Sequence, residues 1–93
     1  MIHNVADVTP AGVKTALKAA RTPANWLMVS APTGNAAPIR IGDSTTSATS
    51  GFLIAPGATF TLLPISDDAY LDLAGVFIFG TTTDKLSVMY GVR

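Results

Sequence analysis

The chain has 93 residues and a mass of 9.6 kDa, and its six basic and six acidic residues give a formal net charge of zero. This length suits one domain, and the neutral charge provides no basic surface for nucleic acid or for an anionic membrane. Only 13% of the residues are charged and 48% are hydrophobic, whereas a typical soluble domain has about 25% charged residues. We therefore expect other copies or a partner to cover part of the surface.

The absence of cysteine excludes a disulfide framework, a thiolate metal site and a catalytic thiol within this chain. The N-terminus lacks a basic region followed by an apolar run, so we expect no secretory signal and synthesis in the cytoplasm. The longest mostly apolar run, residues 71–79, is far shorter than the roughly 18 residues of a membrane span. The sequence thus predicts no membrane segment.

The first 24 residues are predicted to form a short N-terminal arm, for which two structures remain open. Thr9 followed by Pro10 is typical of a helix start, and a helix over 11–21 would place Val13 and Leu17 on one side. The same segment also alternates acceptably as a strand. Local propensity favours the short helix, because neighbouring alanines weaken a strand.

From residue 25 onward, short alternating apolar runs separated by turn residues predict a β-domain over residues 25–93. Pro56 and Gly57 fit the centre of a type II turn, and Asp67–Asp68 marks another turn. The polar tract 43–50 is predicted to be an exposed loop or edge. The predicted strands lie at 25–31, 37–42, 51–55, 58–65, 69–75, 76–79 and 85–93.

The strand at 76–79 is apolar on both faces, which predicts a central strand or one that is pressed against a neighbouring subunit. By contrast, residues 85–93 alternate, with Leu86 and Val88 on one side and Ser87 and Met89 on the other. About seven strands at this spacing predict an all-β fold, a small antiparallel β-sandwich or jelly-roll-like barrel.

The residues that could carry chemistry do not form a catalytic or metal-binding motif. His3 has no histidine or cysteine companion, and the adjacent Asp67 and Asp68 would point to opposite faces of an extended segment, which makes a poor calcium site. Asp43 and Asp84 occupy turn-like contexts, where the side chain bonds nearby backbone N–H groups. We therefore expect no enzyme activity, no catalytic residues, no cofactor and no metal site.

Several segments together resemble small virion proteins of tailed bacteriophages, and the resemblance extends from about Trp26 to Arg93. The segments are PIRIGD at 38–43, SGFLIAPG at 50–57, YLDLAGVFIFG at 70–80 and DKLSVMYG at 84–91. The resemblance is greatest to head decoration (cement) proteins, β-sandwiches that bind the outside of the capsid, often as trimers. The N-terminal segment departs from it, because TPAGVKTALKAAR stands where a strand rich in Thr and Val is expected.

The resemblance implies a capsid-stabilising protein on the outer surface of the phage head. Its implied partners are the major capsid protein and further copies of itself, with a homotrimer favoured. The predicted interface residues are Val13, Leu17, Trp26, Phe77 and Phe79.

The alternative is a tail or fibre module that recognises a host-surface glycan. It needs exposed aromatic side chains, whereas the strand pattern favours burial of most aromatics, Trp26 included.

Overall fold

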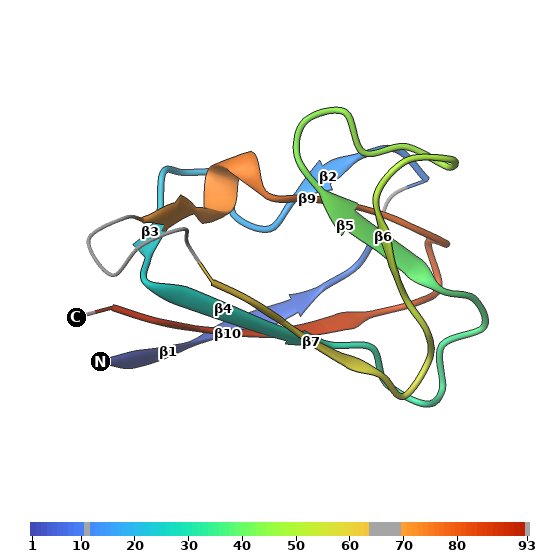
Figure 1. Ribbon diagram of the computed structural model, residues 1–93. Helices are drawn as coiled ribbons and strands as arrows, with labels where there is room; N and C mark the ends of the chain where they lie inside the picture. The colour runs from blue at the N-terminus through green and yellow to red at the C-terminus, as the bar shows by residue number, and fades with distance from the viewer. Residues whose placement is uncertain (11, 64–69, 93) are drawn as a thin grey trace.

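The chain forms two antiparallel sheets packed face to face, which confirms the predicted all-β fold (Figure 1). The computed structural model describes residues 1–10, 12–63 and 70–92. Sheet A has the strand order β1-β10-β4-β7, sheet B has the order β2-β9-β5-β6, and β3 pairs with β8. The strands are β1 (Ile2–Val8), β2 (Thr15–Ala16), β3 (Pro23–Ala24), β4 (Trp26–Ser30), β5 (Ile39–Gly42), β6 (Phe52–Ile54), β7 (Thr59–Leu62), β8 (Leu71–Asp72), β9 (Phe77–Phe79) and β10 (Leu86–Gly91).

The hydrophobic core lies between the two sheets and is filled by alternate residues of their strands. Alternation places these side chains on the inner faces because successive residues of a strand point to opposite sides. The predicted alternation in 85–93 is confirmed, since Leu86 and Val88 are buried while Met89 is partly exposed. The buried residues of the central strands are Leu27, Val29, Leu86 and Val88 from sheet A, and Ile39, Ile41 and Ile78 from sheet B.

One open side of the sandwich is bridged by an aromatic pair. Phe52 on β6 and Phe60 on β7 stack with their ring centroids 4.8 Å apart. Because β6 and β7 are edge strands of different sheets, this contact joins the two layers where no backbone pairing does. It accounts for the position of Phe52, which remains 59% exposed.

The N-terminal segment is not helical, and the helix predicted over 11–21 is wrong. Residues 2–8 form the long edge strand β1 along β10, and Thr15–Ala16 pair with β9. The only helix in the described residues is one 3-10 turn, η1 (Leu73–Gly75), and no described helix is long and apolar enough to cross a membrane. Backbone pairing with distant strands overrides the weak helical propensity. The segment predicted as an arm therefore lies within the sandwich.

Two other local predictions agree with the structure. Gly57 has a φ of 85°, and the Ala58 N–H donates to the Ala55 carbonyl over 2.9 Å, as expected for a type II turn at Pro56–Gly57. Strand β9 lies between β2 and β5, so the predicted central strand is confirmed. The predicted turn at Asp67–Asp68 lies outside the described residues.

Candidate interaction surface

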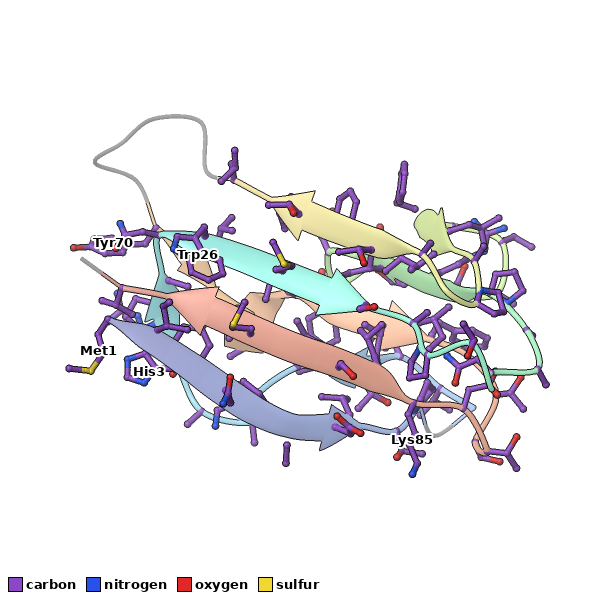
Figure 2. The ribbon with its side chains drawn as sticks, turned by 90° about the horizontal axis from the view of Figure 1, so that it is seen from below. Met1, His3, Trp26, Tyr70 and Lys85 are labelled. Carbon is purple, nitrogen blue, oxygen red and sulfur yellow. The ribbon has the colours of Figure 1, made fainter. Side chains whose placement is uncertain are left out.

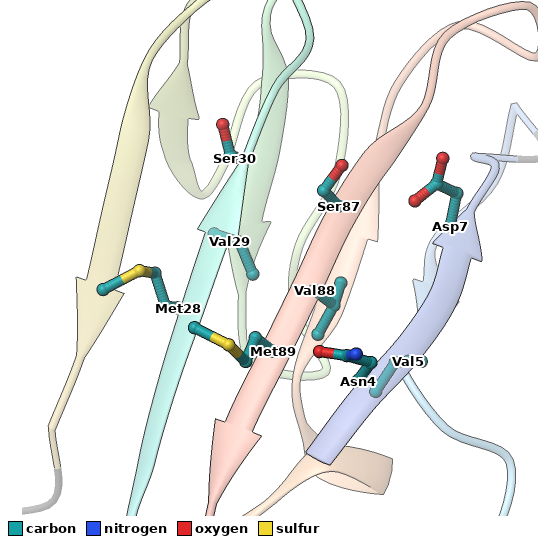
Figure 3. A pocket seen from close by; sticks show the side chains of 9 residues that line it. All are labelled: Asn4, Val5, Asp7, Met28, Val29, Ser30, Ser87, Val88 and Met89. Atoms are coloured by element: carbon teal, nitrogen blue, oxygen red, sulfur yellow. The ribbon is translucent and has the colours of Figure 1, made fainter. Parts of the chain in front are cut away.

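The outer face of sheet A carries a shallow apolar groove that crosses β1, β10 and β4 (Figure 3). Strand register aligns Asn4 with Met89, and Met89 with Met28, so the two thioethers lie next to each other on the solvent side. The groove has a volume of about 350 Å³. Its outward-facing lining consists of Asn4, Asp7, Met28, Ser30, Ser87 and Met89.

Trp26 extends this face beyond the two methionines. It stands opposite Gly91 on β10, on the same side of β4 as Met28. Its indole lies directly over Gly91, because a Cβ atom on that glycine would be only 2.0 Å from the indole nitrogen. Trp26 is thereby half-buried, and its ring contributes apolar surface to the outer face of sheet A.

The outer face of sheet B combines aromatic side chains with two cations. Arg40 stands opposite Phe79 on one side and Leu53 on the other, and the three line a depression of about 440 Å³. The Arg40 guanidinium donates to the carbonyls of Ala48 and Gly51, over 3.0 and 2.7 Å, so residues 48–51 hold it in place. The Lys14 ammonium lies 5.4 Å from the centre of the Phe77 ring, within range of a cation–π contact.

The five predicted interface residues do not form one patch. Trp26 lies on the outer face of sheet A, whereas Phe77 and Phe79 lie half-buried on the outer face of sheet B. Val13 is 62% exposed. Leu17 is only 4% exposed and belongs to the core, so its side chain is not on the surface.

Sequence reasoning did not predict that Met28 and Met89 lie on the same outer face as Trp26. The signal was present, since Met28 follows Trp26 by two positions in a strand and Met89 lies on the side of β10 opposite Leu86. What the sequence did not provide was the register that brings the two methionines together.

The carboxylates of Asp43, Asp72 and Asp84 accept hydrogen bonds from backbone N–H groups. Asp84 is buried and accepts hydrogen bonds from the N–H groups of Ala36 (2.8 Å) and Ala37 (3.2 Å), so its partners are distant in sequence. Asp43 bonds locally, as predicted, to the Thr45 N–H over 2.8 Å. Asp72 accepts from the N–H groups of Thr22 and Ala74.

No cluster of side chains that could hold a metal ion forms in the part of the chain that the structure describes. Residues 1–10, 12–63 and 70–92 contain no group of three histidine or carboxylate side chains that could hold a metal ion. His3 instead stacks on Tyr90, with ring centroids 4.9 Å apart. Asp67 and Asp68, considered above for calcium, lie outside the described residues.

The hydrogen bonds to the carboxylates of Asp72 and Asp43 predict that the protein loses stability in acid. Hydrogen bonds from the Thr22 and Ala74 N–H groups lower the pKa of Asp72 below its usual 3.8, and the Thr45 hydroxyl and N–H lower the pKa of Asp43. A folded-state pKa below the unfolded value means that the stabilisation is complete above pH 3.8 and is lost as the pH falls through the folded value. At pH values below 3.8 we expect the urea concentration at the midpoint of unfolding to decrease, and to decrease less for Asp72→Asn than for the wild type. Equal acid dependence of the two proteins would contradict this role of Asp72.

The comparisons with known proteins support the fold alone. No protein-family model matches the chain, and no curated protein matches it significantly. The structure is similar to a chain from the solved structure entitled "Bacillus endospore appendages form a novel family of disulfide-linked pili", with a TM-score of 0.50 and 18% sequence identity. The match covers 100% of this chain and 88% of that chain. The two proteins therefore share a small all-β architecture.

Proposed function

We propose that this chain is a non-enzymatic structural protein of a bacteriophage virion, which binds the outer surface of the head and stabilises the capsid. One observation carries the proposal: both outer faces of the sandwich present apolar side chains, among them Met28 on sheet A and Leu53 on sheet B, which is 50% exposed. Because only 13% of the residues are charged, few charged side chains are available to make these faces hydrophilic. Contacts with other subunits would cover them.

Assembly on a symmetric shell suits a small protein of this kind. Each copy needs only a weak contact with the major capsid protein, because a homotrimer on a symmetric lattice multiplies the contacts. The structural neighbour comes from pili described as disulfide-linked, which supports an assembly role for this architecture. The present chain has no cysteine, so its own residues cannot form disulfide links between copies.

Val13 provides a test of the contact with the capsid. Its side chain is 62% exposed, so Val13→Asp is expected to leave the fold intact and to reduce the amount of this protein on purified heads at least tenfold. Such a loss corresponds to about 1.4 kcal/mol of binding free energy per contact. Occupancy would be measured by quantitative immunoblot of heads after incubation with the purified protein. Ala20→Asp, at an exposed position in the turn between β2 and β3, is the control and should bind normally. Equal occupancy of the two variants would contradict docking through Val13.

A second candidate is the glycan-binding module of a phage tail or fibre. The end of the molecule that carries the chain termini supports it, because Trp26 and the 62% exposed Tyr70 both lie there (Figure 2). Aromatic rings are the surfaces on which sugar rings stack. Titration of host-surface saccharides against the fluorescence of Trp26, the single tryptophan, tests this candidate. A saturable shift that Tyr70→Ala abolishes would favour it over capsid decoration.

A further inference from the structure

We infer that copies of this chain associate directionally, with the outer face of sheet A of one copy packed against the outer face of sheet B of the next. The inference rests on the proposed function, since it names the surfaces through which the homo-oligomer forms. Three features carry it: the placement of the two faces, their apolar side chains and their opposite charges.

The two faces lie on opposite sides of the molecule. Sheets A and B are the two layers of the sandwich, and their outer faces point away from each other (Figure 1). A contact between unlike faces leaves one free face at each end of a pair. Such contacts close into a ring if the rotation between copies allows it, and otherwise they extend into a filament.

The apolar side chains of the two faces are chemically suited to each other. The outer face of sheet A (face A) presents the flexible thioethers of Met28 and Met89 along a shallow groove. The outer face of sheet B (face B) presents the rigid ring of Phe79, which lines the same depression as Leu53. Methionine adapts to irregular surfaces and makes favourable sulfur–aromatic contacts, so the methionines can pack around the ring.

The charges of the two faces are opposite, and neither Asp7 nor Arg40 has an oppositely charged partner among the described residues. Asp7 lines the groove on face A, and within the described residues its carboxylate accepts no hydrogen bond and forms no ion pair. Arg40 lines the depression on face B and is bonded to two carbonyls, but to no carboxylate of the described ranges. A contact between the faces brings this acid and this base together in an apolar setting, where a charged pair fixes orientation and register.

Charge reversal tests this contact in purified protein, without capsids. Sedimentation velocity over a concentration series would compare the wild type with Asp7→Lys, Arg40→Glu and the double variant. We expect each single variant to self-associate at least tenfold more weakly than the wild type, and the double variant to recover association. A mixture of the two single variants should also recover association, with the two variants alternating, because each face of one variant then meets an oppositely charged face of the other.

Two further variants separate loss of contact from loss of fold. Arg40→Glu also removes the bonds to residues 48–51, so Leu53→Asp provides an independent change on face B at a half-exposed site. Lys85→Glu reverses an exposed cation that lines neither depression and should associate like the wild type. A wild type that stays monomeric at about 1 mM, where contacts as weak as roughly 4 kcal/mol would be detected, would overturn the inference. So would an unaltered association of both Asp7→Lys and Leu53→Asp.

These results are distinguishable from failure of the proposed function. Binding to heads is measured with the Val13 variant and does not require self-association in solution. Copies that associate through these faces but never bind heads would contradict capsid decoration and leave the contact between copies intact.

Discussion

Asp84→Ala is expected to lower the free energy of unfolding by about 3 kcal/mol. The Asp84 side chain is 2% exposed, and its two oxygens accept hydrogen bonds from the backbone N–H groups of Ala36 and Ala37. Alanine would leave both donors without a partner in a partly buried place, and each such loss costs about 1–3 kcal/mol. Equilibrium unfolding in urea, monitored by far-ultraviolet circular dichroism, measures the change.

The matched control for this prediction is Asp7→Ala. Asp7 is exposed, and its carboxylate makes no hydrogen bond or ion pair with another described residue, so its loss should change stability by less than about 0.5 kcal/mol. Asp84→Asn should be intermediate, because its amide keeps one acceptor oxygen but turns a second donor toward a backbone N–H. If Asp84→Ala is as stable as Asp7→Ala, the carboxylate does not hold the two segments together.

Gly91→Ala is expected to destabilise the protein by about 1–3 kcal/mol, the usual cost of overpacking. The added Cβ atom would be 2.0 Å from the indole nitrogen of Trp26 and 2.2 Å from the adjoining ring carbon. The indole must therefore leave its place across β10 and become more exposed to water. Urea unfolding measures the loss of stability, and the emission of the single tryptophan should shift to longer wavelength.

A double-mutant cycle identifies the cause. In a Trp26→Leu background the Gly91→Ala change should cost much less, because the clash partner has been removed. Gly34→Ala is the control, since a Cβ atom on Gly34 would meet no atom within 4 Å. If Gly91→Ala lowers the free energy of unfolding equally in both backgrounds, the indole of Trp26 is not the group that excludes a side chain at position 91.

The sequence predicted the strands well wherever the local pattern matched the final sheet. The alternation in 37–42 corresponds to β5, and the turn residues at Pro56–Gly57 separate β6 from β7. In these segments the side chains that make the pattern are the ones buried between the sheets, so the local signal and the tertiary structure agree. The predicted strand at 69–75 is split, since only Leu71–Asp72 is extended and η1 follows it.

The N-terminal segment was misread because its structure depends on strands that are distant in sequence, β9 for Thr15–Ala16 and β10 for β1. The pairing of Ile2 with Gly91 and of Asn4 with Met89 joins the first and last strands of the fold. No residue between 1 and 10 signals that partner. In isolation the segment has only its weak local propensities, whereas in the fold β10 pairs with β1 on both sides of an irregularity between Val5 and Val8.

The candidate surface was only partly predictable for the same reason. Composition predicted that other copies or a partner cover part of the surface, which stays a prediction, and the pattern placed Phe77 and Phe79 in a central strand. Register decides which apolar residues meet, and it placed Met28 next to Met89 while the fold buried Leu17. The bond from Asp84 to Ala36 spans 48 residues, so a prediction based on neighbours in sequence could not find it.

The proposed role in the phage head is tested most directly by the location of this protein on the particle. Immunogold labelling of purified particles with an antibody to this protein, viewed by negative-stain electron microscopy, reports the location. We expect gold spread evenly over the heads, and we expect heads that lack the protein to resist heat and low salt less well. Gold confined to tails or fibres, or an absence of labelling on particles, would contradict the proposed function.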